Sequence, residues 1–212
     1  VVQARLVWEN PSKNRALFAE KIKATATDVD VIILPEMFTT GFTINPDNIA
    51  LSEDAATLNW MRQMANESGS AIVGSIVYRE KEQNYNRLFF VNPDGSASSY
   101  DKRHTFTLAG EDKKYNAGTE QLLVSYKGFT FCPLICYDLR FPELFNHYRT
   151  NAAMVVTIAN WPSTRTAQWL CLLQARAIEN QYFVIGVNRT GKDGNGLKYD
   201  KSRVIFNPIA EQ

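Results

Sequence analysis

The sequence predicts an α/β domain built as a sandwich with a mixed sheet, and three observations lead to this fold class. Segments with helical spacing of apolar residues alternate with strand-like segments near both ends of the chain. Pairs of strand-like segments joined by turns occupy the middle, which disfavours a purely parallel, doubly wound sheet. No internal repeat, linker or low-complexity stretch interrupts the 212 residues. We therefore expect a single domain over residues 1–212.

Two helices and two strands are predicted in the first part of the chain. Asn10 and Pro11 form a typical helix start, because asparagine caps free N–H groups and proline fits the first helical position. The apolar run over residues 31–34 predicts a strand that is buried on both faces. A second helix is expected to begin at the capped, acidic segment that starts with Ser52, and a second strand covers residues 71–78.

The rest of the chain contains paired strands and then returns to the alternation of strand and helix. The turn over residues 92–95 joins the first pair, and a Lys-Gly turn at residues 127–128 joins the second. The expected elements are, in order, strands over residues 87–91, 99–102, 121–126, 129–136 and 153–159, a helix over 166–179 and a strand over 182–187.

The composition excludes several classes of protein. Apolar residues make up 45% and charged residues 21%, which is typical of a globular domain and not of a disordered chain, a coiled coil or a collagen-like rod. The formal net charge of +1 gives no electrostatic basis for binding a nucleic acid or an anionic membrane. No apolar run approaches the roughly 20 residues that a membrane helix needs. We expect a small-molecule partner, no nucleic acid and no membrane.

The cysteines and the missing cofactor motifs narrow the possibilities further. Three cysteines, Cys132, Cys136 and Cys171, indicate a reducing compartment without disulfides, so we expect a cytoplasmic protein. Cys and His residues do not follow a zinc-binding spacing, and we expect no metal. The glycine-rich residues 191–196 follow a strand without opening a helix, so we interpret them as a turn and not as a phosphate-binding loop. The serine hydrolase motif Gly-x-Ser-x-Gly is also missing.

Three strand-like segments end at residues that could carry chemistry, namely Glu36, Lys102 and Cys136. Active sites of α/β folds lie at the carboxyl ends of strands. A thiol at a strand-to-helix turn is held still and faces a cleft, and we expect nearby amides and positive charge to lower its pKa. Each residue alone has an ordinary interpretation: a salt-bridged carboxylate, a surface lysine and a buried small side chain. Together they supply the base, the cation and the nucleophile of an acyl-transfer reaction.

The surroundings of these residues carry a family resemblance. The three segments read LPEMFTTGF, YDKRH and LICYDLRFPEL, and in this order they resemble the catalytic glutamate, lysine and cysteine motifs of the nitrilase superfamily of carbon–nitrogen hydrolases. The resemblance extends from Val1 to about Val204. Two further stretches, ANWPSTRTAQW and QARAIENQYFVIGVNRTG, are similar to the branch of short bacterial omega-amidases. That branch hydrolyses the distal amide of 2-oxo dicarboxylic acid monoamides such as 2-oxoglutaramate or 2-oxosuccinamate.

The resemblance implies a role for each residue. Cys136 attacks the amide carbonyl and forms a thioester with release of ammonia. Glu36 takes the thiol proton, protonates the leaving amine and later activates water. Lys102 and the backbone N–H of Tyr137 stabilise the tetrahedral oxyanion, and Glu111 positions the substrate or the lysine.

The resemblance also implies an architecture. We expect an α-β-β-α sandwich with mixed sheets, which needs no cofactor and forms a homodimer, through its outer helical layer, or a higher homo-oligomer. The chain stops at Gln212, before the C-terminal extension of longer family members, so we expect the domain to lack part of that extension. Residues 144–147 and 202–210 are compressed relative to the family, as if residues were missing from both places. This leaves the final strands and the dimer surface open.

The substrate-binding residues must be inferred separately. We expect Phe38, Phe106 and Trp161 to line the cleft. The carboxylate of an acidic substrate needs a cationic partner, because a buried carboxylate without one is costly. We expect Arg165 to hold it in a bidentate grip, although an exposed arginine at a helix start is the equally weighted alternative. Arg140 is a second candidate unless structural carboxylates occupy it.

Other functions remain open at this point. The chain could be a nitrilase proper, an N-carbamoyl amino acid hydrolase or an aliphatic amidase of the same superfamily. It could also be a catalytically inactive binding member, although the intact set of three residues argues against this. A Cys–His hydrolase would have to use His104 or His147, and the sequence shows no residue that would orient either imidazole.

Overall fold

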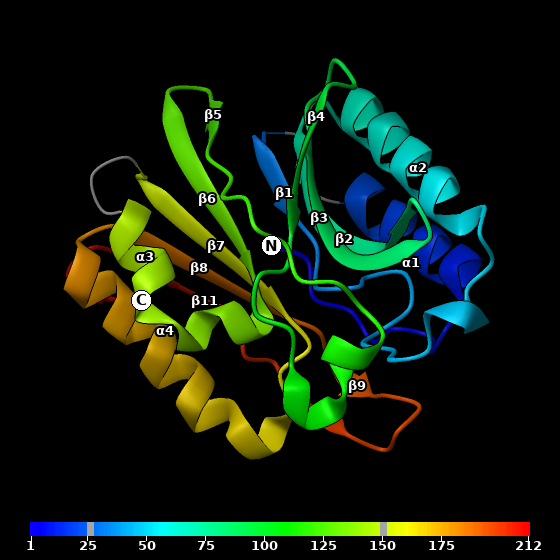
Figure 1. Ribbon diagram of the computed structural model, residues 1–212. Coiled ribbons are helices and arrows are strands. Elements are labelled where there is room, and N and C mark those ends of the chain that lie inside the picture. The colour runs from blue at the N-terminus through cyan, green and yellow to red at the C-terminus, as the bar shows by residue number, and fades with distance from the viewer. Residues whose placement is uncertain (25–27, 149–151) are drawn as a thin grey trace.

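The computed structural model describes residues 1–24, 28–148 and 152–212, apart from the side chains of residues 147 and 148. Two sheets pack face to face, and helices cover the outer side of each (Figure 1). One sheet is covered by α1 (Pro11–Lys23) and α2 (Glu53–Ser68), the other by α3 (Pro142–Tyr148) and α4 (Thr166–Asn180). The order of layers is α-β-β-α, which confirms the expected sandwich.

The first sheet has its strands in chain order. They are β1 (Val31–Ile33), β2 (Ala71–Glu80), β3 (Gln83–Val91) and β4 (Ala97–Asp101). β1 pairs with β2 in parallel, whereas β2 with β3 and β3 with β4 are antiparallel. β1 and β4 therefore run in the same direction. Glu36 and Lys102 follow them at the same edge of the sheet.

The second sheet has the strand order β11-β8-β7-β6-β5. Its strands are β5 (Val124–Tyr126), β6 (Phe129–Ile135), β7 (Met154–Ala159), β8 (Phe183–Asn188) and β11 (Val204–Phe206). The three central strands are parallel and the two outer strands are antiparallel to them, so both sheets are mixed as expected. Because β6 and β7 are parallel neighbours, Cys136 and Asn160 follow them at one edge.

Short elements that the sequence did not predict connect the strands near this edge. They are the 3₁₀ helices η1 (Pro46–Asn48), η2 (Thr107–Ala109), η3 (Glu111–Lys113), η4 (Cys136–Arg140) and η5 (Ser163–Arg165), and the ribbon of β9 (Gly191–Lys192) with β10 (Lys198–Tyr199). Elements of two to five residues show no hydrophobic period, which is why a pattern-based reading misses them.

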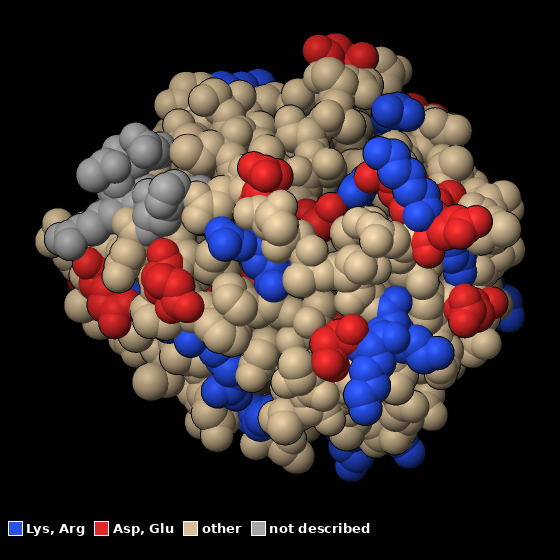
Figure 2. All heavy atoms as spheres, in the orientation of Figure 1, with Lys and Arg blue, Asp and Glu red and all other residues tan. Residues whose placement is uncertain are grey.

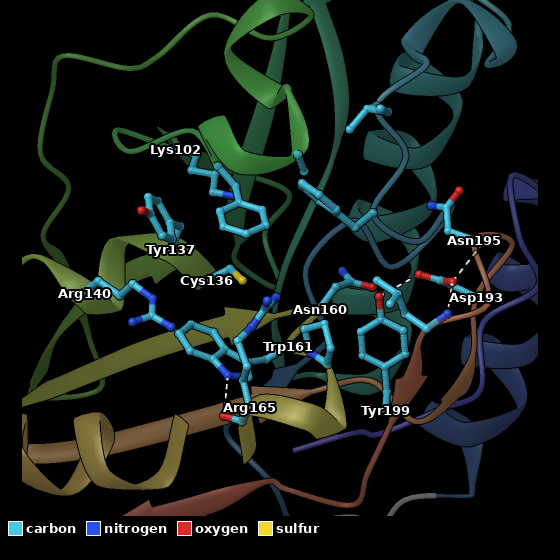
Figure 3. Close-up of a pocket in the computed structure, with 16 residues that line it drawn as sticks. Lys102, Cys136, Tyr137, Arg140, Asn160, Trp161, Arg165, Asp193, Asn195 and Tyr199 are labelled. Atoms are coloured by element: carbon cyan, nitrogen blue, oxygen red, sulfur yellow. Dashed lines mark hydrogen bonds between the residues drawn. The ribbon is translucent and has the colours of Figure 1, made fainter. Parts of the chain in front are cut away.

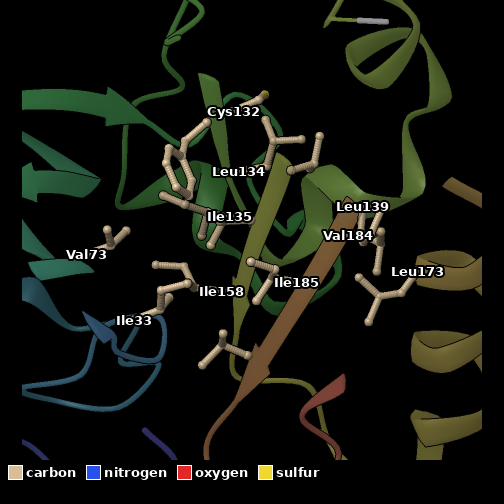
Figure 4. Packing of buried hydrophobic residues seen from close by; sticks show 14 of the residues in the cluster. Ile33, Val73, Cys132, Leu134, Ile135, Leu139, Ile158, Leu173, Val184 and Ile185 are labelled. Carbon is tan, nitrogen blue, oxygen red and sulfur yellow. The ribbon is translucent and has the colours of Figure 1, made fainter. Parts of the chain in front are cut away.

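The apolar interior has two main clusters. Between the sheets, Val73 of the first sheet faces residues such as Ile135 and Ile158 of the second, and the cluster continues to Leu173 of α4 (Figure 4). A separate cluster packs α1 and α2 against the first sheet, with Phe18 and Met61 fully buried. Burial on both faces explains why the central strands read as continuous apolar runs.

Several local sequence signals are confirmed. Asn10 caps α1 by accepting a hydrogen bond from the Lys13 N–H at 3.1 Å. Gly69 ends α2 with a left-handed φ of +67°, a conformation that glycine adopts without strain. β3 begins at residue 83 and not at residue 87, because its polar first residues pair with β2 beyond the buried part of the sheet.

Charged side chains of both signs are interspersed with uncharged surface on the face shown in Figure 2. This distribution agrees with the near-zero net charge. Within the described ranges, no helix is long and apolar enough to span a membrane.

Candidate active site

Glu36 lies in a turn just after β1, and neighbouring groups fix its carboxylate completely. The side chain is fully buried. One oxygen accepts hydrogen bonds from Lys102 Nζ at 3.0 Å and Asn86 Nδ2 at 2.8 Å. The other accepts from the Asn160 backbone N–H at 2.7 Å. In this turn the next residue, Met37, has a φ of +43°. Its backbone N–H donates a hydrogen bond to the Ser75 hydroxyl.

Lys102 follows β4 directly, and its ammonium sits between two carboxylates. Nζ donates to Glu36 at 3.0 Å and to both oxygens of Glu111 at 2.9 and 3.1 Å. All three side chains are no more than 1% exposed. Burial by itself lowers the pKa of Lys102, but Glu111 and Glu36 raise it by more, so the net pKa lies above its ordinary value. The lysine therefore stays charged at every physiological pH.

Glu111 is the second carboxylate of this cluster. Its oxygens also accept hydrogen bonds from the backbone N–H of Phe106 and, at 3.4 Å, from the side-chain amide of Asn86. Burial and the nearby Glu36 raise its pKa, against the opposing effect of Lys102. Two buried carboxylates thus share one ammonium.

Cys136 is the first residue after β6, and its backbone has a φ of +47°. This left-handed conformation is strained for a cysteine and turns the chain sharply from β6 into η4. Burial, followed by the negative charge of Glu36, raises the pKa of the thiol well above its ordinary value, and Lys102 opposes both. Our expectation of a lowered pKa was wrong, because burial and the nearby carboxylates outweigh the single ammonium. The resting thiol needs a base to remove its proton, and Glu36 is the carboxylate with the largest effect on it.

A pocket of about 190 Å³ opens beside this cluster. Cys136 and Lys102 reach its wall, whereas Glu36 lies behind them. Figure 3 shows Arg140 and Tyr137 toward one end of the pocket and Asp193, Asn195 and Tyr199 toward the other, with Cys136 and Arg165 between them. The site can therefore hold a small molecule whose carbonyl meets the thiol and whose anionic end meets a guanidinium.

Comparison with known proteins decides the family. The carbon–nitrogen hydrolase family model matches residues 1–208. The chain belongs to the carbon–nitrogen hydrolase family. It is 39% identical over 211 residues to the omega-amidase YafV of Escherichia coli, an alignment that covers 100% of this chain and 81% of that protein. It is 35% identical over 196 residues to the 2-oxoglutaramate amidase of Bacillus subtilis, covering 91% of this chain and 76% of that protein.

A solved structure supports the same assignment. The CN-hydrolase superfamily protein of Xanthomonas campestris, solved with an arsenic adduct in its active site, superposes with a TM-score of 0.93. The two chains are 39% identical, and the match covers 99% of this hydrolase and 82% of the other protein. The expected superfamily and fold are both confirmed.

Four of the five residues expected in the substrate cleft of this hydrolase line the pocket, namely Phe106, Arg140, Trp161 and Arg165. Phe38 does not, and that expectation was wrong. Its ring is fully buried on the other face of the first sheet, where it packs against Phe18 and Trp60. Met37 has a positive φ in the turn that follows Glu36, and Phe42, five residues after Met37, lines the pocket instead.

The sequence left open which groups surround the two arginines of the hydrolase. Arg140 is exposed, and within the described part of the chain no carboxylate pairs with it. Its guanidinium lies 5.0 Å from the Trp161 ring centroid, and that of Arg165 lies 5.6 Å from Phe106. Aromatic faces therefore orient both cations without neutralising them, which leaves both available to an anion.

Sequence reasoning missed several residues of the site. Asn160 holds Glu36 through its backbone N–H and through a side-chain bond of 2.6 Å to the Glu36 carbonyl. It follows β7 directly, so the strand-end rule that found Glu36 could have found it. The turn over residues 191–196 is confirmed, but it also brings Asp193 and Asn195 to the pocket wall. Asp193 is pinned by Tyr199 at 2.7 Å.

The structure shows the surroundings of one of the two histidines that a Cys–His hydrolase would have to use. His104 Nδ1 lies 3.0 Å from Asp138, and its ring stacks on Phe141 at a centroid distance of 3.5 Å. It does not line the pocket. The side chain of His147 lies outside the described residues. In the part of the chain that is described, no three His, Cys, Asp or Glu side chains are grouped to hold a metal ion.

Proposed function

We propose that this hydrolase cleaves the distal amide of a small 2-oxo dicarboxylic acid monoamide, such as 2-oxoglutaramate or 2-oxosuccinamate, and releases ammonia. The observation that carries the proposal is one pocket that contains a thiol next to a buried base, together with unpaired guanidinium groups. The names of the relatives, omega-amidase and 2-oxoglutaramate amidase, support the same substrate class.

The first half of the reaction forms an acyl-enzyme. Glu36 removes the proton of Cys136 as the sulfur attacks the amide carbon. The negative charge that develops on the carbonyl oxygen is stabilised by Lys102 and by the backbone N–H of Tyr137. The C–N bond then breaks, Glu36 returns its proton to the nitrogen, and ammonia leaves a thioester on Cys136.

The second half restores the enzyme. Glu36 takes a proton from water, which attacks the thioester carbonyl, and Lys102 again meets the oxyanion. Collapse of this intermediate breaks the C–S bond, and the proton returns to the sulfur. Glu111 keeps Lys102 charged and in place throughout, since it contacts the ammonium through both of its oxygens.

Specificity comes from the opposite end of the substrate. We assign its carboxylate to Arg165 and Arg140, while Trp161 and Phe106 provide the flat walls between which the carbon chain lies. A four- or five-carbon diacid monoamide places its amide and its carboxylate at opposite ends of one short chain. This matches a pocket whose wall carries a thiol and two guanidinium groups.

The test compares four substrates by the ammonia they release: 2-oxoglutaramate, a neutral amide of equal length, an N-carbamoyl amino acid and a nitrile. For the nitrile, formation of the carboxylic acid product is measured as well. We expect kcat/KM to be highest for 2-oxoglutaramate and to vanish after alkylation of Cys136. Preference for one of the other substrates would assign the chain to another branch of the family. Absence of turnover on all four would favour a binding member.

We also propose that the hydrolase works in the cytoplasm as a homodimer or a higher homo-oligomer. The expected dimer surface is the outer helical layer, and Ile178 of α4 is 57% exposed there. Light scattering of the purified protein tests the assembly. A monomer at micromolar concentration would contradict it.

A further inference from the structure

We propose that Asp138 is a positioning residue that joins the loop carrying the nucleophile to the loop carrying the lysine. This inference rests on the proposed function, because it concerns how the same catalytic groups are held. Asp138 does not line the pocket, so it acts through its neighbours and not on the substrate.

The side chain of Asp138 is fully buried and accepts four hydrogen bonds. One oxygen accepts from the Tyr100 hydroxyl at 2.8 Å and from the Ile135 backbone N–H at 3.1 Å. The other accepts from the backbone N–H of His104 at 2.9 Å and from its Nδ1 at 3.0 Å. Hydrogen bonds to a carboxylate are among the stronger ones in proteins, and in the interior no water replaces them.

These donors bracket both catalytic positions. Tyr100 and His104 lie two residues before and two residues after Lys102. Ile135 and Asp138 lie on either side of Cys136 and Tyr137. One carboxylate therefore fixes the turn that presents the thiol and the oxyanion-binding N–H, and it fastens this turn to the end of β4.

The strained backbone of Cys136 explains why such a clamp is needed. A left-handed φ at a residue other than glycine costs about 1–3 kcal/mol and persists only where the surroundings enforce it. Asp138 enforces it from inside the turn by holding the Ile135 N–H. The His104 ring, held at Nδ1, stacks on Phe141 with an interplanar angle of 9° and so also braces the far end of η4.

The isosteric change Asp138→Asn tests the clamp. In one orientation of the amide its NH₂ group faces the Ile135 N–H, and in the other it faces the His104 N–H, so no orientation satisfies every donor. We expect kcat to fall by up to about a hundredfold, the scale of a misplacement of about 1 Å, while KM changes little. Labelling of Cys136 by iodoacetamide, followed by mass spectrometry of its peptide, should slow in parallel. This second readout needs no amide substrate, so it stands even if the proposed substrate is wrong.

A matched control separates positioning from general stability. Ser70 is also buried and also joins separate backbone segments, through a bond of 2.6 Å from its hydroxyl to the Val29 carbonyl, but it directly precedes β2 and is not part of the pocket. Ser70→Ala should lower the melting temperature and leave kcat and the labelling rate of folded protein unchanged. Wild-type kcat and labelling rate in folded Asp138→Asn would overturn the proposal. A parallel loss of both in Ser70→Ala would do the same.

A milder variant covers the case in which Asp138→Asn does not fold. Tyr100→Phe removes one donor without changing charge or packing shape, and we expect kcat to fall by about threefold to tenfold. If Tyr100 acts through Asp138, adding Tyr100→Phe to Asp138→Asn should cause little further loss. Unchanged kcat in Tyr100→Phe, or fully additive losses in the double variant, would contradict the clamp.

Discussion

The two sheets of the sandwich contribute different kinds of groups to the site. The ends of β1 and β4 and the segment after β4 supply Glu36, Lys102 and Glu111, whose charged side chains are at most 1% exposed. Cys136 follows β6, Arg140 ends η4, and Asn160 and Trp161 follow β7, so that the pocket is lined largely from this half. The two carboxylates are therefore buried on one side of the site, and most of the pocket wall comes from the other.

This difference separates the chemistry from the specificity. The first half forms a charge cluster in which both oxygens of each carboxylate have a fixed partner, as a preorganised electrostatic environment requires. The second half presents the thiol of Cys136 and two guanidinium groups that lie over aromatic rings and have no carboxylate partner among the described residues. Changes in the first half should thus remove activity toward all amides, and changes at the arginines should alter the choice among amides.

The largest effect on activity is expected for Cys136, which lies where the two halves of the site meet. Cys136→Ala should lower kcat by a factor of about 10⁴ or more, because no other described group at the pocket can form the thioester. The melting temperature should stay the same or rise, since alanine removes no apolar contact of importance and leaves Glu36 and Lys102 paired. Steady-state ammonia release and thermal unfolding measure the two quantities.

The other cysteines serve as controls for this prediction. Cys171 lies exposed on α4, and Cys171→Ala should keep full activity. Cys132→Ala should keep activity as well but lose some stability, because Cys132 is fully buried in the apolar cluster of the second sheet. Activity of Cys136→Ala equal to that of wild type would exclude the thioester mechanism.

Within the buried half, Glu36→Gln should lower kcat by about 10²- to 10⁴-fold. Both acylation and thioester hydrolysis should fail, because glutamine can neither accept nor return the proton of Cys136. Rapid-quench measurement of ammonia distinguishes the steps. A normal burst followed by slow turnover would mean that another group serves acylation, and Glu36 would then act only on water.

Lys102→Met should affect both rate and stability. Loss of an oxyanion donor lowers kcat by about 10²- to 10³-fold. The change also leaves Glu36 and Glu111 buried next to each other without their cation, which destabilises the fold by about 3–5 kcal/mol. Urea unfolding and kinetics of the folded fraction check the two effects. If only KM rose, the lysine would contribute uniform binding instead of oxyanion stabilisation.

The same contrast explains what the sequence could predict. Glu36, Lys102 and Cys136 each follow a strand, and this placement depends on chain order alone, so the edge where they meet could be predicted. The sign of the pKa shift of Cys136 could not, because it depends on how deeply the thiol is buried and on how many charges of each sign come together from distant segments. One ammonium and two carboxylates gather there, and neither their number nor their distances can be read from a motif.

Side-chain direction after a strand was the other limit. The expectation that Phe38 lines the cleft was wrong, because Met37 takes a positive φ in the turn and the following ring packs against Phe18 on the opposite face of the sheet. For Arg140 the sequence left two possibilities open, a substrate contact or structural carboxylates, and the structure places its guanidinium at the pocket wall, over Trp161. Such outcomes are decided by one backbone dihedral or one tertiary contact, and neither leaves a periodic signal in the sequence.

The smallest effect, and the one that tests the binding half alone, is expected at the arginines. Arg165→Ala should lower kcat/KM for 2-oxoglutaramate. The corresponding loss of transition-state stabilisation is about 2–4 kcal/mol, the usual scale for removing one partner of a desolvated charge pair. The kcat/KM for a neutral amide of equal length should change little, because the charge cluster around Glu36 is untouched.

Arg140→Ala is the matched variant, since both guanidinium groups line the pocket and both lie over an aromatic ring. The arginine that bears the carboxylate is the one whose loss discriminates between the two substrates. If both variants lost activity on the acidic and the neutral amide in parallel, the arginines would be structural, and the division between a chemical half and a binding half would fail.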